Sequence, residues 1–204
     1  MAHHRKALAA AVALNTAIVA VELPAGLQAG SLSLLMDAVH NLSDEMALVA
    51  LYLAFVLPLG VSRNLLRSAN LFNSLGLLVV SGLVLWQAVE RLLHPAPVLS
   101  WVPVVVGLGA AAANLGVARL LWRPSRNNAA VRLAYLHNLG DAFASLAPVL
   151  AGVLVSVSGH SFFDPLIASV IATWIIVSTV REAVASREEL IWPEKIVCGH
   201  TEPE

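Results

Sequence analysis

Residues 32–59 read LSLLMDAVHNLSDEMALVALYLAFVLPL, a predominantly apolar run that contains the pentapeptide His40-Asn41-Leu42-Ser43-Asp44. A bilayer core about 30 Å thick requires roughly 20 apolar residues per helix, so this run is long enough to cross a membrane. Five further runs of similar character lie at 7–28, 71–89, 99–121, 131–157 and 162–180. The sequence therefore predicts an all-α integral membrane protein, a bundle of six transmembrane helices.

The composition supports a membrane protein. Apolar residues make up 58% of the chain and charged residues 12%, with a mean hydropathy of +0.79, whereas roughly a quarter of the residues in an ordinary soluble domain are charged. The expected connections are short, as at 63–70, so we expect one transmembrane domain over 1–185 and a short cytoplasmic tail over 186–204. The net charge of -1 gives no indication of a nucleic-acid partner.

The basic residues predict the orientation in the membrane. If both termini are cytoplasmic, only Arg91 of the twelve Lys and Arg residues lies on or near the outer side, and such an excess of positive charge on one side is typical of the cytoplasmic face. An alternative reading of the start is a cleaved signal peptide, which would leave five spans. We expect the chain to lie in the cell membrane, the inner membrane of a bacterium.

A second pentapeptide, His137-Asn138-Leu139-Gly140-Asp141, lies in the fifth run. Residues at i and i+4 share one face of a helix, so each copy can direct an imidazole and a carboxylate to the same point. A hydrogen-bonded pair at a helix interface explains one copy equally well. The presence of two copies favours a functional role for these His and Asp residues, because ionisable residues inside a membrane are costly and usually functional.

The predicted topology brings the two pentapeptides to one depth. The second and fifth spans run in opposite directions, and His40 lies nine residues past Ser31 and His137 nine past Asn128, each about 13 Å deep at 1.5 Å per residue. His40 can then lie level with Asp141, and Asp44 level with His137. The sequence predicts a metal site near the membrane midplane, with His40, Asp44, His137 and Asp141 as ligands.

Two imidazoles and two carboxylates favour a tetrahedral ion of borderline softness, zinc first, although cadmium, cobalt or nickel can enter such a site. A complete ligand set leaves no position for an activated water, which argues against an enzyme. Structural zinc sites are typically rich in cysteine, and the single Cys198 lies in the tail. Because these ligands lose protons to bind metal, and histidine titrates near about 6.5, we expect transport of zinc in exchange for protons.

Residues 31–44 resemble the second-helix signature of the cation diffusion facilitators, a family of zinc transporters, and residues 128–144 resemble the fifth-helix signature. The resemblance covers about residues 7 to 185. Further matching positions are Glu22, Gly26, Asn70, Glu90-Arg91-Leu92, Asn114 and Asp164-Pro165.

The resemblance implies a proton-coupled antiporter that moves divalent metal out of the cytosol and works as a homodimer. It places His40, Asp44, His137 and Asp141 at the transport-site positions of the family. Most members carry a cytoplasmic domain after the sixth helix, and we expect this chain to lack it. The alternative functions are therefore a non-transporting partner or metal sensor. An intramembrane metalloenzyme is a less favoured alternative.

Several polar residues near the pentapeptides have two interpretations each. Asp37 can orient His40 by a hydrogen bond to a ring nitrogen, or it can serve helix packing. Asn41 and Asn138 can hold the ligands or bridge helices, and the sequence favours bridging. Glu22 can relay protons or lie near the outer interface.

Pro148 interrupts the fifth run seven residues after Asp141. Proline has no N–H group, so the carbonyl of Ala144 loses its helical donor and a kink is expected there. We interpret this kink as a hinge that lets the fifth helix move and change access to the site.

Overall fold

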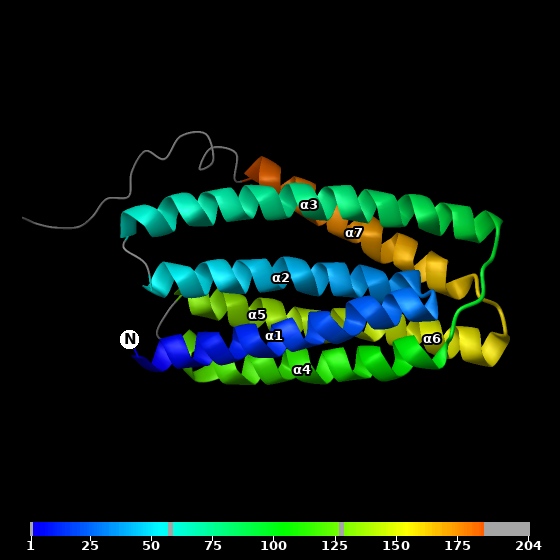
Figure 1. The fold of residues 1–204 in the computed structure, drawn as a ribbon, viewed down its shortest axis with the longest axis horizontal. Coiled ribbons are helices and arrows are strands. Elements are labelled where there is room, and N and C mark those ends of the chain that lie inside the picture. The colour runs from blue at the N-terminus through cyan, green and yellow to red at the C-terminus, as the bar shows by residue number, and fades with distance from the viewer. Residues whose placement is uncertain (1, 57–58, 127–128, 186–204) are drawn as a thin grey trace, which may run out of the picture.

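The computed structural model describes residues 2–56, 59–126 and 129–185, and nearly all of them are helical (Figure 1). No β-strand occurs in these ranges. The helices are α1 (Ala2–Ala29), α2 (Leu32–Val56), α3 (Leu59–Leu93), α4 (Trp101–Ser125), α5 (Ala129–Ala144), α6 (Leu146–Ser158) and α7 (Phe163–Ala185).

Five helical segments in the described part of the chain are long and apolar enough to cross a membrane. They lie in α1, α3, α4, the combined α5 and α6, and α7. The sixth spanning helix is α2, which carries Asp37, Asp44 and Glu45 among its apolar residues. The predicted six-helix transmembrane bundle is confirmed.

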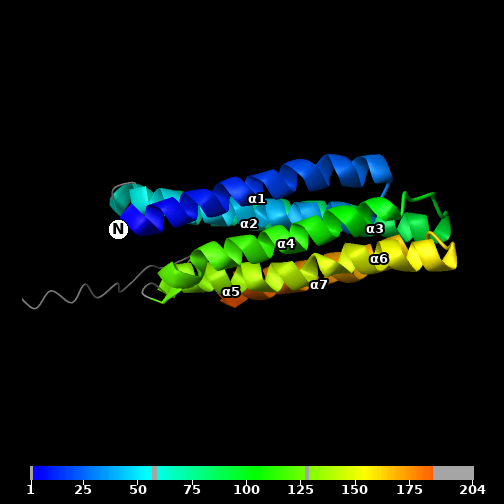
Figure 2. The same ribbon diagram turned by 90° about the horizontal axis from the view of Figure 1, so that it is seen from below.

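The helices run up and down along one axis (Figures 1 and 2). The start of α1 marks what we call the N-terminal end of the bundle, and the α1–α2, α3–α4 and α6–α7 connections mark the distal end. Helices α1, α2, α4 and α5 lie together, and α3 lies along α7 on one side of them. Short connections between sequential helices make the neighbours antiparallel, as in other helical bundles.

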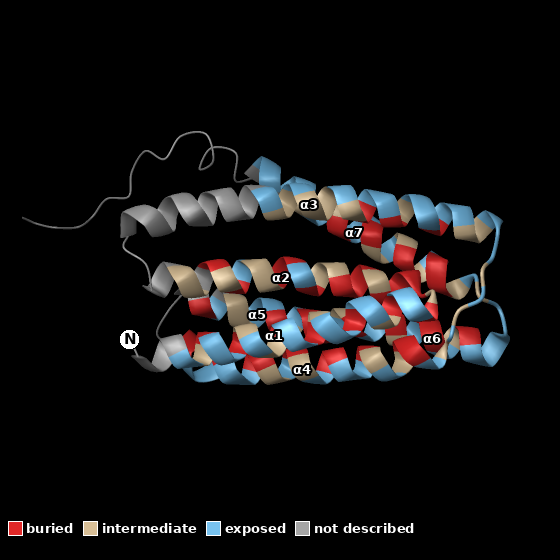
Figure 3. Cartoon of the chain, in the orientation of Figure 1, coloured by how far each residue is buried: buried red, intermediate tan, exposed pale blue. Residues whose placement is uncertain are grey.

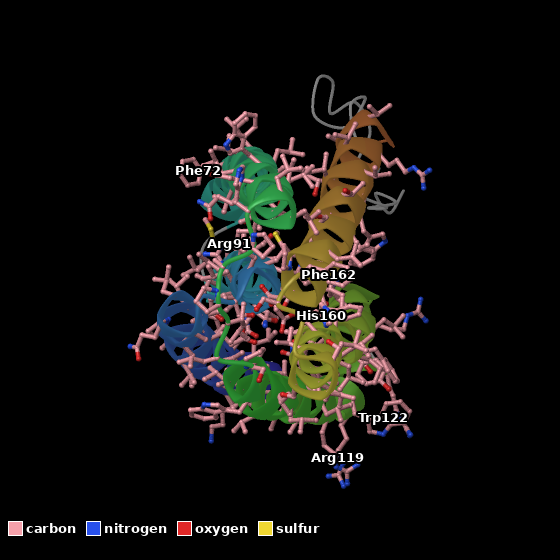
Figure 4. All side chains as sticks on the ribbon, turned by 90° about the vertical axis from the view of Figure 1, so that its right-hand side faces the viewer. Phe72, Arg91, Arg119, Trp122, His160 and Phe162 are labelled. Atoms are coloured by element: carbon pink, nitrogen blue, oxygen red, sulfur yellow. The ribbon has the colours of Figure 1, made fainter. Side chains whose placement is uncertain are left out.

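Buried residues face the helix interfaces, and exposed residues cover the outward faces (Figure 3). One apolar cluster joins α2, α3 and α7 in the distal half and includes Leu32, Met36, Val84 and Ile175. A second cluster joins α1, α2, α4 and α5 in the N-terminal half and includes Leu8 and Leu121. In the end-on view of Figure 4, Phe72, Arg119 and Trp122 point away from the bundle. The exposed apolar rings of Phe72 and Trp122 suit contact with lipid.

The predicted connection at 63–70 is wrong, because Leu59–Leu93 forms one continuous helix. The polar residues there mark the limit of the apolar span, which begins at Phe72, without ending the helix. Residues 61–75 contain no glycine or proline, and leucine, arginine and alanine favour helix. The helix therefore continues beyond the apolar span.

The fifth span is divided into α5 and α6 at Ser145, where the sequence predicts a kink. Pro148 lies in the first turn of α6, where its missing N–H costs least. The amide of Ser145 still donates to the carbonyl of Asp141 at 2.8 Å. The interruption thus begins one turn after the second pentapeptide.

A buried carboxylate joins α7 to the start of α2. Asp164 accepts hydrogen bonds from Ser31 Oγ at 2.6 Å, from the amide of Leu32 at 2.6 Å and from Ser33 Oγ at 2.5 Å. The first amides of a helix have no partner within the helix, and a carboxylate there is also favoured by the helix dipole. Asp164 therefore caps α2 from a neighbouring helix.

Further contacts hold the distal end together. Gly30 has φ of 64° in the α1–α2 turn, a conformation that glycine adopts without steric cost, and its carbonyl accepts a hydrogen bond from Arg91 of α3 (Figure 4). A Cβ atom on Gly152 of α6 would lie 2.5 Å from the carbonyl oxygen of Ser100. The chain at the start of α4 thus approaches α6 closely, and the distal end is closed by packing.

We expect Asp164→Ala to lower the free energy of unfolding by roughly 3 kcal/mol, because it leaves buried donors at the start of α2 without an acceptor. Chemical or thermal unfolding of the purified chain in detergent measures the change. Thr173→Ala is the control, since its exposed hydroxyl bonds only to the Ser169 carbonyl of the same helix. Equal stability of the two variants would contradict the capping role of Asp164.

Candidate metal centre

The four predicted ligands converge between two antiparallel helices. Helix α2 carries His40 and Asp44, and α5 carries His137 and Asp141, each pair one turn apart on its helix. Both aspartates are buried, His40 is half-buried, and the side chain of His137 is 47% exposed. The structure thus brings together all four residues that the sequence singled out.

Each histidine contacts the aspartate of the opposite helix. His137 Nε2 lies 2.6 Å from Asp44 Oδ1, and His40 Nε2 lies 3.3 Å from Asp141 Oδ1. The distances within each pentapeptide are longer, 3.7 Å from His40 Nε2 to Asp44 Oδ2 and 3.9 Å from His137 Nε2 to Asp141 Oδ2. The cross-helix pairs therefore hold the two helices in register at this level.

The donor atoms are spaced as a small cation requires. In a tetrahedral zinc site with metal–ligand distances near 2.1 Å, neighbouring donor atoms are about 3.4 Å apart. His40, Asp44 and Asp141 each place one donor atom within 4.8 Å of the other two. His137 completes the set through its contacts with both carboxylates.

A cavity of about 740 Å³ adjoins the four side chains. Besides the pentapeptide residues, α3 and α7 line it with apolar side chains such as Leu77 and Ile175 and with a few polar and aromatic ones, namely Asn73, Ser74, Trp174, Ser178 and Thr179. The Trp174 ring meets the His40 ring edge to face, with centroids 6.3 Å apart. Neutral amide and hydroxyl groups of this kind can contact a hydrated cation without binding it as tightly as the carboxylates do.

The cavity lies on the N-terminal side of the four ligands. Its further lining residues, such as Ala47 on α2 and Ala183 on α7, lie toward the N-terminal end of the bundle. In the distal direction, Leu32, Met36 and Ala168 belong to the apolar cluster between α2, α3 and α7. The cavity therefore extends from the four ligands toward the N-terminal end, and apolar packing lies on their distal side.

The residues expected beside the ligands have different roles in the structure. Asn41 bridges helices, since its Nδ2 donates to Glu22 Oε2 at 2.7 Å and its Oδ1 accepts from Asn114 at 3.2 Å. Asn138 donates to the carbonyl of Ala134 in its own helix. Asp37 contacts Glu22, and the Nδ1 atom of His40 has no hydrogen-bond partner among the described residues.

Sequence reasoning missed the polar lining supplied by α3 and α7 and part of the network around Asn41. Asn15 of α1 donates to the Asn41 carbonyl at 3.0 Å, and Ser145 accepts from Asn114 at 3.3 Å. The spacing of Asn15 and Glu22, seven residues, places both on one face of α1 and is a usable signal. No comparable signal identifies Asn73 or Thr179, because serine, threonine and asparagine occur on many faces of membrane helices.

The family of the chain follows from its comparison with known proteins. Residues 8–191 match the model of the cation efflux transmembrane domain. The chain belongs to the cation efflux family. Its membrane spans, its helical bundle and the His and Asp cluster between α2 and α5 agree with that membership.

Among its curated relatives in this family is the zinc transporter ZitB of Escherichia coli, which is 31% identical over 180 residues, 84% of this chain and 58% of the relative. ZitB of Pectobacterium atrosepticum is 30% identical over 196 residues, 91% of this chain and 61% of the relative. A cadmium, cobalt and zinc/H(+)-K(+) antiporter of Bacillus velezensis is 28% identical over 184 residues, 85% of this chain and 58% of the relative. The chain spans about three fifths of the length of these relatives.

The cavity extends toward the N-terminal end of the bundle, so we expect a water-soluble reagent to reach it from that side. In a full chain with Cys198→Ser, we expect Thr179→Cys to react with a charged, membrane-impermeant thiol reagent added on the side of the N-terminus, and zinc to slow the reaction. Ala172→Cys, buried in the distal half of the same helix, is the control. It should react at least about tenfold more slowly, because a buried thiol reacts only after local opening.

Labelling of Thr179→Cys only from the side opposite the N-terminus would contradict this geometry. The rates are measured by mass spectrometry of the protein reconstituted in sealed vesicles of known orientation.

Proposed function

We propose that the chain is a divalent-metal efflux transporter that exchanges zinc for protons through His40, Asp44, His137 and Asp141. The observation that carries the proposal is the convergence of these four side chains, from two antiparallel helices, at the closed end of a one-sided cavity. The relatives named as zinc transporters support zinc as substrate. Cadmium and cobalt are named for another relative. Cadmium is softer than zinc and cobalt is similar to zinc, and both ions suit the same donors.

Competition between metal and protons follows from the contacts of the site. A hydrogen bond between His137 Nε2 and Asp44 Oδ1 requires a proton between the two atoms. A metal ion that uses both atoms as ligands must displace that proton. Metal entry and proton departure therefore occur at the same atoms, as exchange requires.

The cavity supplies the direction of access. If both termini are cytoplasmic, as the basic residues predict, the cavity admits metal from the cytosol and the packed distal end is the outer gate. Release would then require the distal end to open and the N-terminal end to close. A homodimer, which the family resemblance implies, remains a prediction for this chain.

Purified full chain in proteoliposomes tests the transport function. We expect zinc uptake driven by an imposed pH gradient, and its loss in His40→Ala, Asp44→Asn, His137→Ala and Asp141→Asn. Zinc affinity should fall by more than about 100-fold in each, because loss of an outer partner of a ligand alone costs 10–100-fold. Uptake is followed with a zinc-sensitive dye, and affinity by calorimetry.

His160→Ala is the matched control, since His160 lies exposed in the α6–α7 connection and bonds to Ser158. It should transport like the unmodified chain. Wild-type rates in Asp44→Asn would refute the site. Zinc binding at the four residues without uptake would instead favour the non-transporting partner or metal sensor.

A further inference from the structure

Two carboxyl groups lie together between α1 and α2, apart from the four metal ligands. Glu22 and Asp37 are 1% and 3% exposed, and their carboxyl groups are within hydrogen-bonding contact of each other. We call them the carboxyl pair. Neither residue lines the cavity beside the metal centre. The pair is therefore a separate, enclosed polar position inside an apolar bundle.

The surroundings of the pair are neutral or acidic. Asn41 donates to Glu22 Oε2 at 2.7 Å, and the hydroxyl of Ser145 lies against Asp37. The ionisable groups that face the pair from the adjoining helices are His40 of α2 and Asp141 of α5. Among the lysines and arginines whose side chains the structure describes, none is buried, and Arg119 of α4 points away from the bundle (Figure 4).

The pair also has unused hydrogen-bonding capacity. Glu22 Oε1 and Asp37 Oδ2 are buried and have no donor among the described residues. Two ionised carboxylates offer only acceptors, so they cannot bond to each other, and their charges repel strongly where water is excluded. A proton on one of them supplies the missing donor and removes one of the two charges. The two buried oxygens without a donor, on carboxyl groups in contact with each other, thus favour one proton held between them.

We propose that Glu22 and Asp37 share one proton and form a second proton-binding site, which metal binding empties. The second part of the proposal, release of the proton when metal binds, rests on the proposed function. Asp37 lies one turn before His40 on α2, so a divalent ion held by His40 favours the ionised pair through its charge. The proton leaves to water and the pair changes from one negative charge to two, while the metal centre gains the two positive charges of the ion and loses those of the protons that the ion displaces.

The glutamine and asparagine variants isolate the shared proton. In Glu22→Gln, the amide NH2 replaces the proton as donor toward Asp37, and the amide oxygen can still accept from Asn41. The fold should therefore tolerate the change while the pair loses its proton. In Asp37→Asn, the new amide NH2 replaces the proton as donor toward Glu22. Glu90→Gln is the matched control, because Glu90 is an exposed carboxyl on α3.

Proton release on zinc binding is measured by titration calorimetry of the full chain near neutral pH, in buffers of different ionisation heat. We expect Glu22→Gln and Asp37→Asn each to release one proton fewer per zinc than the unmodified chain, with unchanged zinc stoichiometry. The double variant should release no fewer than either single variant, because the pair holds one proton and not two. Glu90→Gln should release the same number as the unmodified chain.

Infrared spectroscopy gives an independent readout. The metal-free chain should show a carbonyl band of a protonated carboxyl group that zinc removes and that both single variants lack. Unchanged proton release and an unchanged band in Glu22→Gln would overturn the shared proton. If the unmodified chain binds no zinc, the proposed function fails, and the band of the metal-free chain still decides whether the pair holds a proton.

Discussion

Asp44 and Asp141 are buried inside an apolar bundle, and no lysine or arginine whose side chain the structure describes is buried beside them. Burying an ionised carboxylate is costly unless it is paired and hydrogen-bonded. The only partners at hand are two histidines, each carried by the helix opposite the aspartate it contacts. This mutual dependence fixes the register of α2 against α5. It also leaves four donor atoms together, which we propose bind protons when metal is absent and metal when protons leave.

The two ends of the bundle differ in the kind of contact that holds them. At the distal end, Asp164 caps α2, Arg91 bonds to the Gly30 carbonyl, and α4 approaches α6 closely at Gly152. Toward the N-terminal end, α3 and α7 diverge enough from α2 and α5 to leave the cavity, lined by side chains such as Asn73. Charge-assisted hydrogen bonds are directional, so those at the distal end break together. A water-accessible cavity places little constraint on the positions of the helices around it. Opening the distal end therefore means exchanging the bonds of Asp164 for others.

The sequence predicts what depends on local pattern and on topology. The apolar runs predict six spans, and the repeat of His-x-x-x-Asp on two antiparallel spans predicts that His40 meets Asp141 and His137 meets Asp44. Contacts between residues far apart in the chain have no such signal, as the cap of α2 by Asp164 shows. The predicted break at 63–70 failed for another reason. Polarity marks where a membrane span ends, but helix formation depends on backbone propensity, and nothing there opposes it.

The interruption at Ser145 connects the metal centre to the buried network. Ser145 follows Asp141 by one turn, bonds to its carbonyl, and accepts from Asn114, which also donates to Asn41. Asn41 in turn donates to Glu22. The break between α5 and α6 lies at Ser145, three residues before Pro148, and the movement of α5 relative to α6 at this break stays a prediction. A displacement of Asp141 would therefore act on Ser145, through Ser145 on Asn114, and through Asn114 and Asn41 on Glu22 of the carboxyl pair.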